Sequence, residues 1–497
     1  MLSLFDCFHK VELFATIPDK GTLQFKHKFY TFPLKNYIIH TYISASLAFQ
    51  PSRFALKFFY FCEKSIKIRV MKIKILLYFF TATLFFGCNK AENWNQYLGP
   101  NRNNTISAQK ILTEWPEQGP EKLWEIKLGP GYGGASIFGD EVYILDREKE
   151  ESDILRCLDL ETGKEKWNYK YEAKGEIPYP GSRIVPFVDN KNVWTVGPHG
   201  HLYCFDKKTQ QPVWNVNLQE KFEAERPNWG FSQSPLIYNE MVIAAPQGKK
   251  AGIVAFDKLS GAVIWESRPL KGYNFHVSPM LANFGGTNQV IMISPYNRSD
   301  STQTHEVISV DANTGKVLWE YDGLKSFATI APPTVVDESR LFLTDCSYNG
   351  NYNPVSILLE IKKEGENFIV NELWKTEEAG CKMHPGIVVG EHIYLNSNGR
   401  PNEMVCLTMD GKLAWQKQTG GNFEMGSLIK VGEYLINQDG KTGEIALIEP
   451  SPNAYKEFAR ASFFDSEKPQ AWAPMAFSRG KLLLRDMEKM VCVNFSE

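Results

Sequence analysis

Several patterns that mark common enzymes and ligand-binding proteins are missing from this chain of 497 residues. It has no P-loop, no GxGxxG run that opens a helix, no GxSxG nucleophile elbow and no CxxC or CxxCH motif. Its formal net charge is only -2, so no overall field attracts it to nucleic acid. Strong helical periodicity is also scarce. Short alternating runs of Val, Ile, Leu and Tyr between turn residues take its place, which is typical of β-strands.

The first 70 residues lack what the rest of the chain contains. They hold none of the 12 Trp and one of the 37 Gly, but 11 of the 32 Phe. Turn residues are scarce in them, and they show no trace of the repeat described below. We therefore interpret residues 1–70 as a spurious or disordered upstream extension; a separate N-terminal domain is the alternative.

A lipoprotein signal peptide is predicted over residues 71–87, in the stretch "MKIKILLYFFTATLFFGCNK". Lys72 and Lys74 supply its positive start, and the apolar run after them is too short to span a bilayer. The pair Gly87-Cys88 resembles the lipobox of bacterial lipoproteins, although Phe85 differs from the commonest form. This resemblance implies that Cys88 carries a lipid and becomes the new N-terminus. An ordinary cleaved secretory signal is the alternative.

One short phrase recurs along the remainder of the chain. It reads "VDANTGKVLWEYDG" at residues 310–323, and similar phrases start at residues 155, 202, 253, 357 and 404. Successive tryptophans of these phrases lie 41–55 residues apart: Trp167, Trp214, Trp265, Trp319, Trp374 and Trp415. An all-β repeat of this length predicts propeller blades, each a four-stranded antiparallel sheet. Eight units can be counted; seven blades is the alternative if the seventh unit, where Tyr455 and Phe458 stand in place of the tryptophan, is degenerate.

The residue types in the phrase predict a turn and a packing contact. Asp311 and Thr314 can bond nearby backbone groups, and Gly315 can adopt a positive φ at no steric cost. Trp319 follows on the next strand, where its large apolar area can fill the space between neighbouring sheets. Because no single blade can bury that face alone, the phrase is predicted to be structural.

The last repeat unit is short of one strand. It ends at "KMVCVNFSE", and a matching strand, "EKLWEIKL" with Trp124, lies far upstream at residues 121–128. We expect this N-terminal strand to pair beside residues 490–493 and close the ring, which hides the edges of an open sheet. The propeller is thus predicted over residues 121–497, preceded by a lead-in segment at 88–120.

Most cysteines of the propeller occupy one position of the repeat. Elsewhere that position holds Ala255 or Ser309, so it accepts small side chains and predicts buried packing rather than chemistry. The four cysteines at this position are Cys157, Cys204, Cys406 and Cys492. Cys346 and Cys381 fall in segments interpreted as loops, and whether they pair is left open.

Function in a propeller is expected where the segments that enter the first strand of each blade ring the channel mouth. These segments carry a mixed polar and aromatic set: Arg183, Trp229, His276, His384, Glu424 and Trp472, with Tyr132 and Thr329 at the equivalent places. Such a set could hold an anion, a sugar or a planar ligand, or could merely bond between blades. Neither His276 nor His384 lies in a HxH or HExxH pattern, so no metal site is predicted. The long polar stretches 294–306 and 344–356 are interpreted as channel-side loops.

The repeated phrases resemble those of the pyrroloquinoline-quinone-type β-propeller superfamily over essentially everything from Trp94 to the C-terminus. The superfamily includes quinoprotein alcohol dehydrogenases and the propeller lipoprotein of the outer-membrane β-barrel assembly machinery. The resemblance implies the fold but leaves the function open. Its enzymes generally need a Ca²⁺ site of carboxylate and amide ligands, a catalytic Asp and often adjacent cysteines, and no Cys-Cys dipeptide occurs here.

Two functions are therefore weighed. The favoured one is a lipid-anchored, non-enzymatic propeller of the bacterial envelope, expected at the outer membrane, that binds an envelope protein or a small polar ligand and no nucleic acid. No catalytic residue and no cofactor are predicted for it. The alternative is a dehydrogenase acting on an alcohol or sugar with pyrroloquinoline quinone and calcium.

Overall fold

The computed structural model describes the chain in segments. These are residues 14–16, 24–26, 92–107, 110–272, 276–294, 306–324, 329–348, 352–398, 403–417, 423–466 and 469–497. The chain divides into two compact units, Met1–Lys90 and Ala91–Glu497. In the first unit, β1 (Phe14–Thr16) pairs antiparallel with β2 (Gln24–Lys26). The predicted signal peptide and Cys88 lie outside the described residues.

The second unit is an eight-bladed β-propeller, as the sequence predicts. Four blades follow one another in the first half: β5 (Ser136–Phe138), β6 (Glu141–Glu148), β7 (Ser152–Asp159) and β8 (Glu165–Glu172); β9 (Phe187–Val188), β10 (Asn192–Val196), β11 (His201–Asp206) and β12 (Gln211–Asn217); β13 (Leu236–Tyr238), β14 (Met241–Ala244), β15 (Val254–Asp257) and β16 (Val263–Glu266); β17 (Met280–Phe284), β18 (Thr287–Ser294), β19 (Glu306–Asp311) and β20 (Val317–Tyr321). The short helix α2 (Leu218–Phe222) follows the second blade.

The other four blades complete the ring. They are β21 (Thr334–Val335), β22 (Arg340–Tyr348), β23 (Tyr352–Glu364) and β24 (Asn367–Thr376); β25 (Ile387–Val389), β26 (His392–Asn396), β27 (Met404–Thr408) and β28 (Leu413–Gln416); β29 (Leu428–Val431), β30 (Tyr434–Gln438), β31 (Ile445–Glu449) and β32 (Lys456–Ala461), joined by β3 (Thr105–Ile106); and β33 (Ala476–Ser478), β34 (Lys481–Arg485), β35 (Lys489–Asn494) and β4 (Lys122–Lys127). Among the described residues, no helix is both long and apolar enough to cross a membrane.

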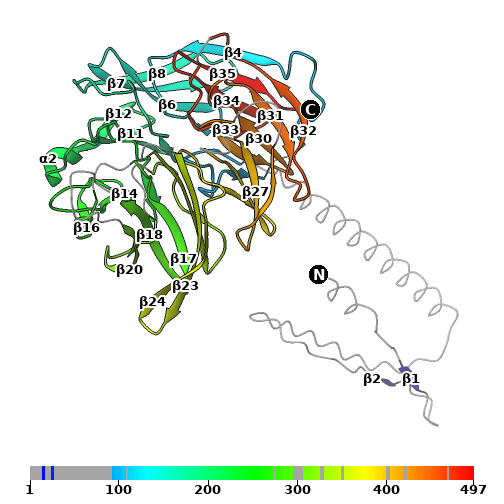
Figure 1. Ribbon diagram of the computed structural model, residues 1–497. Coiled ribbons are helices and arrows are strands. Elements are labelled where there is room, and N and C mark those ends of the chain that lie inside the picture. The colour runs from blue at the N-terminus through cyan, green and yellow to red at the C-terminus, as the bar shows by residue number, and fades with distance from the viewer. Residues whose placement is uncertain are drawn as a thin grey trace. The chain divides into compact units, whose positions relative to one another are not determined.

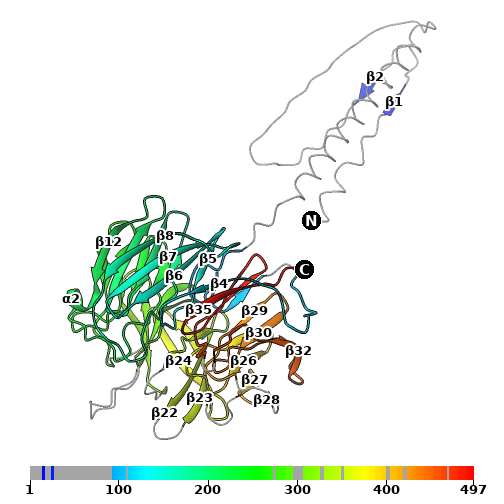
Figure 2. The same ribbon diagram turned by 90° about the horizontal axis from the view of Figure 1, so that it is seen from above.

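The ring closes through the N-terminal strand, which confirms the prediction. β4 pairs antiparallel with β35, and Trp124 lies opposite Cys492. In Figure 1 the cyan β4 therefore lies beside the red β35, although almost the whole chain separates them. In Figure 2 this closing blade lies between the blade of β5–β8 and the blade of β29–β32. Closure leaves no unpaired first or last blade.

The tryptophans of the repeat pack at the seams between blades. On the fourth strand most indoles lie opposite a small residue of the third strand, as with Trp167 and Cys157 or Trp265 and Ala255, while Trp374 lies opposite Leu358. The ring of Trp265 also lies against Gly315 of the next blade, and its Nε1 donates to the carbonyl of Ala312 at 3.2 Å. Six of the seven seam tryptophans are buried, and Trp374 is partly buried: Trp124, Trp167, Trp214, Trp265, Trp319, Trp374 and Trp415.

The turn of the repeated phrase has the predicted geometry. The carboxylate of Asp311 accepts from the backbone N–H groups of Asn313 and Thr314 at 2.9 and 3.0 Å. Gly315 has a φ of 71°, and a Cβ there would approach the Trp265 ring to 2.4 Å. Glycine is therefore required both for the turn and for the close approach of the neighbouring blade.

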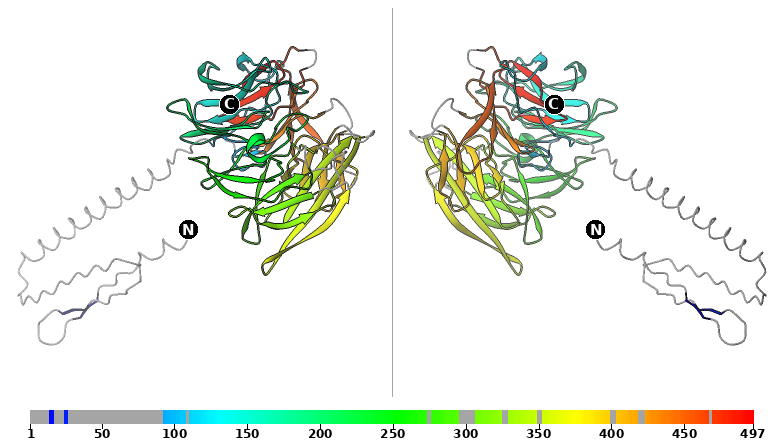
Figure 3. Two further views of the ribbon diagram at one scale, coloured as in Figure 1. Left: turned by 90° about the vertical axis from the view of Figure 1, so that its left-hand side faces the viewer. Right: turned by 90° about the vertical axis from the view of Figure 1, so that its right-hand side faces the viewer.

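Two details of the blades correct the sequence interpretation. In the seventh blade the position of the tryptophan, opposite Leu447, holds Ala459, and not Tyr455 or Phe458. Phe458 is 46 % exposed, while Trp115 of the lead-in and Phe464 pack into the core cluster beside this blade. The stretch 344–356 is mostly not a loop but the paired ends of β22 and β23. The long β23–β24 hairpin extends beyond the neighbouring blades (Figures 1 and 3).

The described cysteines of the propeller are all buried and free. Burial raises the pKa of Cys157, Cys204 and Cys492 to about 12, so these thiols stay protonated and act as small apolar side chains. Cys346 lies in β22 rather than in a loop.

Candidate functional site

A strap formed by residues 92–107 crosses one end of the central channel. Trp94 forms a backbone bridge with Ile137 of the first blade, and the Nδ2 of Asn95 donates to the carbonyl of Val188 in the second. The strap then contacts the third blade through Arg102 and reaches the seventh blade, where β3 pairs parallel with β29. Because it connects opposite blades, the strap closes this end of the channel.

Arg102 fixes the middle of the strap. Its Nη1 donates to the carbonyl of Pro235 at 3.2 Å and its Nη2 to the carbonyl of Pro279 at 2.9 Å, so it ties the third blade to the fourth. The side chain is only 5 % exposed. No periodic pattern marks this contact in the sequence, because the strap lies outside the repeat.

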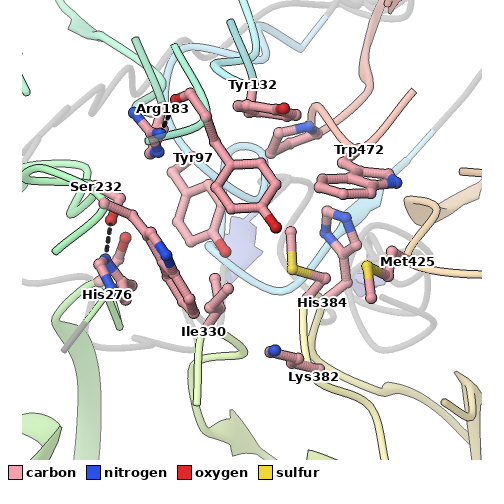
Figure 4. A pocket seen from close by; sticks show the side chains of 15 residues that line it. Tyr97, Tyr132, Arg183, Ser232, His276, Ile330, Lys382, His384, Met425 and Trp472 are labelled. Atoms are coloured by element: carbon pink, nitrogen blue, oxygen red, sulfur yellow. Dashed lines mark hydrogen bonds between the residues drawn. The ribbon is translucent and has the colours of Figure 1, made fainter. Parts of the chain in front are cut away.

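A cavity of about 160 Å³ occupies the other end of the same channel. Tyr97 of the strap lines it from below, and Tyr132, Trp229 and Trp472 belong to segments that enter first strands of blades. Figure 4 shows these segments converging on one space. The cavity therefore has a floor made by the lead-in and walls made by several blades.

Most residues predicted at the channel mouth line this cavity. They are Arg183, Trp229, His276, His384 and Trp472, together with Tyr132. Glu424 and Thr329 do not line it; their neighbours Met425 and Ile330 do. In those two segments, the sequence analysis therefore chose the residue next to the one that lines the cavity. Lining residues that the sequence analysis missed include Tyr97, Tyr179 and Lys382.

Flat rings dominate two walls of the cavity. Tyr132 and Trp472 stack with centroids 5.3 Å apart and planes inclined by 21°. Trp229 and His276 stack at 4.8 Å and 23°. The ring of Tyr179, which is 51 % exposed, lies 6.3 Å from both tryptophans. These rings offer apolar faces to a planar group.

Two cations line the cavity, and they differ in what they already bind. The guanidinium of Arg183 donates to the carbonyls of Pro178, Tyr179 and Gly181, so it holds the turn that precedes its own strand. The Nζ of Lys382 lies 5.5 Å from the centre of the Trp229 ring and has no carboxylate partner among the described residues. Lys382 is thus the cation available to an incoming anion.

The two histidines of the cavity are neutral near pH 7. Burial, with help from Arg183 and Lys382, lowers the pKa of His276 to about 3, and its Nδ1 lies 2.6 Å from the Ser232 hydroxyl. Burial also lowers the pKa of His384 to about 4. Neither ring nitrogen of His384 has a hydrogen-bond partner of normal geometry in the described part of the chain. The ring is 4 % exposed, and the backbone of Trp472 and Met425 beside it partly offsets the lowering of its pKa.

The lining does not fit the calcium-dependent quinone chemistry of the alternative function. Ca²⁺ takes six to eight oxygen ligands, mainly carboxylate and amide groups. None of the residues found to line the cavity is an Asp, Glu, Asn, Gln or Cys. No group of three or more His, Cys, Asp and Glu side chains placed to bind a metal occurs in the described segments. No reaction step through the quinone is therefore derived.

Comparisons with known proteins agree on the fold. The family model for "Outer membrane protein assembly factor BamB" matches residues 150–417. The structure of BamB from Moraxella catarrhalis is 14 % identical, with a TM-score of 0.50, and the match covers 76 % of this chain and 100 % of that one. No curated protein sequence matches the chain.

Two solved enzymes share the same fold. Quinohemoprotein alcohol dehydrogenase from Comamonas testosteroni is 12 % identical, with a TM-score of 0.55, over 82 % of this chain and 81 % of that one. A europium-containing methanol dehydrogenase is 10 % identical, with a TM-score of 0.54, over 79 % and 89 %. At such identities the likeness concerns the fold, and function has to be argued from the site.

Proposed function

The chain belongs to the family of the outer membrane protein assembly factor BamB, whose model matches more than half of it, and from this premise we propose that it is a non-catalytic binding propeller of the bacterial envelope. The blades serve as a rigid frame, and the channel mouth holds a ligand. The dehydrogenase alternative lacks support, because the lining offers no carboxylate set for Ca²⁺.

One observation carries the proposal. The channel is closed at the strap and hollow at the mouth, and the hollow gathers aromatic faces, the buried ring of His384 and Lys382, which has no carboxylate partner in the part of the chain that the structure describes. A channel that only needed to be packed would be filled by apolar side chains. Unpaired polar groups beside a cavity instead favour a bound partner.

The proposed lipid anchor at Cys88 fits this arrangement. The strap is held from Glu92 onward, because the Ser478 hydroxyl donates to the Glu92 carbonyl at 2.8 Å and Gly139 N–H donates to the Asn93 side chain at 2.9 Å. Three residues lie between Cys88 and Glu92, so four extended steps along the chain reach at most about 14 Å. The strap end would therefore lie toward the membrane and the cavity would open away from it.

Occupancy of the cavity tests the proposed function. The full chain would be purified from native membranes in mild detergent and its bound small molecules identified by mass spectrometry. Ile330→Trp fills the cavity wall, and Ile369→Trp places the same ring on the exposed face of β24 as a control. We expect a stoichiometric occupant with the unchanged chain and with Ile369→Trp, but not with Ile330→Trp. An empty cavity in all three, or dye reduction that depends on quinone and alcohol, would overturn the proposal.

A further inference from the structure

We propose that the channel-mouth cavity selects a small aromatic monoanion, a single ring bearing one carboxylate, with Lys382 receiving the anion and the tryptophan-bearing walls receiving the ring. This inference rests on the proposed binding function and names the chemical class of its ligand. It concerns a ligand smaller than the three fused rings and three carboxylates of pyrroloquinoline quinone.

The charge of the lining selects the sign of the ligand. Arg183 and Lys382 are cationic, both lining histidines are neutral near pH 7, and no described residue that lines the cavity is acidic. Arg183 uses three of the five donors of a guanidinium on backbone carbonyls, whereas the three donors of Lys382 have no described side-chain partner. A carboxylate beside Lys382 would gain a charge-assisted hydrogen bond in a partly buried site.

The shape of the cavity selects the size and flatness of the ligand. Its volume of about 160 Å³ is close to that of an apolar protein cavity that holds one benzene ring. Trp229 and Trp472 belong to separate ring stacks, and the ring of Tyr179 lies 6.3 Å from each of them at the mouth. A planar group would meet aromatic faces on more than one side.

His384 adds a neutral polar ring to the same lining. It is buried, both of its ring nitrogens are shielded from the cavity, and neither makes a hydrogen bond of normal geometry with a described residue, although the backbone of Met425 and Trp472 partly offsets the lowering of its pKa. A turn of the ring would let a nitrogen bond to a ligand and recover the free energy that an incompletely paired buried polar group costs. In Figure 4 the ring of His384 lies on the same side of the cavity as Trp472, with Lys382 on the adjacent wall.

The same lining disfavours the other ligands that the channel mouth could have held. A metal cation or an organic cation would meet two positive charges and no carboxylate. A sugar is held mainly by side chains that offer several donors and acceptors at once, and the lining includes no Asn, Gln, Asp or Glu. An aromatic anion is the class that uses both the rings and Lys382.

The experiment compares benzoate with two probes that each lack one of its features. Benzamide keeps the ring and shape without the charge, and acetate keeps the carboxylate without the ring. Binding to the full chain in detergent would be measured by isothermal titration calorimetry at pH 7. We expect benzoate to bind at least about tenfold more tightly than either probe, as the loss of one charged hydrogen bond or one ring contact implies.

Variants locate the anion site. Lys382→Met should weaken benzoate about 10- to 100-fold while leaving benzamide within about twofold, whereas Lys208→Met, at an exposed turn, should change neither. Equal binding of benzoate and benzamide, or an unchanged benzoate affinity in Lys382→Met, would overturn this inference and leave the binding function standing. If no probe binds while an occupant still co-purifies with the chain, the aromatic-anion class is wrong and the binding function again stands. If no probe binds and no occupant is found, both this inference and the proposed binding function are wrong.

Discussion

Two groups of tryptophans in this propeller do opposite things with the same side chain. Six of the seven seam tryptophans are buried, and most of the seam indole N–H groups donate to a backbone carbonyl of the next blade, as Trp124 does to Leu160 and Trp265 to Ala312. The mouth tryptophans, Trp229 and Trp472, are only partly buried, and their indole N–H groups have no acceptor among the described residues. A buried tryptophan whose indole N–H is hydrogen-bonded stabilises the fold. A partly buried tryptophan whose N–H lacks an acceptor is available to a ligand.

The difference follows from geometry around the ring of blades. Most seams repeat one contact, an indole opposite a small residue of its own blade, and in several seams the indole also meets a glycine of the next blade. The mouth is built once, from eight non-equivalent entering segments and the strap. Repetition stabilises the frame, while the lack of repetition at the mouth lets each segment contribute a different chemistry.

The largest effect is expected from removing the strand that closes the ring. Deleting residues 121–128 takes away β4 and Trp124, so β35 loses its partner and exposes a sheet edge. We expect aggregation and loss of the cooperative unfolding transition, measured by light scattering and circular dichroism. Replacing the exposed Lys122, Glu125 and Lys127 of β4 by Ala, which keeps the strand, should leave the protein soluble. Unchanged melting of the deletion would refute the role of β4 in closure.

A single seam tryptophan should cost less but still a large amount. Trp265→Ala removes a buried ring and its hydrogen bond to the next blade, and we expect the free energy of unfolding to fall by about 3–5 kcal/mol. Its neighbour Ile264 is 48 % exposed, so Ile264→Ala should cost less than about 1 kcal/mol. Denaturant unfolding of the two variants measures the contrast. Similar losses would show that the seam is not the main site of packing.

The seams could be predicted from the sequence because their signal repeats. The spacing of the tryptophans, the small residue opposite each and the Asp–Thr–Gly turn recur often enough to give blade number and the closing strand. The seventh blade failed in detail because Ala459 breaks the pattern, and its space is filled by residues such as Trp115 from outside the repeat. A substitution that occurs in a single blade does not recur at the repeat period, so the repeat does not reveal it.

The mouth could be predicted only by position. Knowing that segments entering first strands meet at the mouth was enough to find Arg183, His276 and His384. It did not fix which side chain in a segment points inward, which is why Glu424 was chosen beside Met425. The strap was missed for a different reason: Arg102 bonds to carbonyls of Pro235 and Pro279, more than a hundred residues away, and backbone carbonyls carry no sequence signature.

Acid should weaken the fold through the buried histidines of the mouth. Burial holds the pKa of His384 at about 4, while the unfolded chain has the ordinary value of about 6.5. As pH falls from 6.5 to 4, the unfolded state takes up the proton first, so the free energy of unfolding decreases by up to about 1.4 kcal/mol per pH unit for this group. Asp153 opposes this change, because burial raises its pKa to about 6 and its protonated form favours the folded state.

A substitution separates the two contributions. His384→Phe removes the titrating ring of the mouth and keeps Asp153, so the decline in stability between pH 6.5 and 4 should become shallower than in the unchanged chain. Denaturant unfolding at several pH values measures the slope. Parallel pH profiles would show that His384 titrates normally in the folded protein. The comparison shows whether the buried polar groups of the mouth lower the free energy of unfolding in a way that the seams do not.

The smallest effect on stability is expected at the mouth. Trp229→Leu replaces a half-buried ring that stacks on His276 and lies under Lys382, but contributes no hydrogen bond in the described structure. We expect the free energy of unfolding to change by less than about 1 kcal/mol, well below the seam variant. Benzoate affinity should nevertheless fall by about two- to tenfold, because one stacking face is lost. A large loss of stability with unchanged affinity would reverse the assignment and make Trp229 part of the frame. The opposite outcome, a stable protein that binds poorly, is what distinguishes a ring placed for a ligand from one placed for the fold.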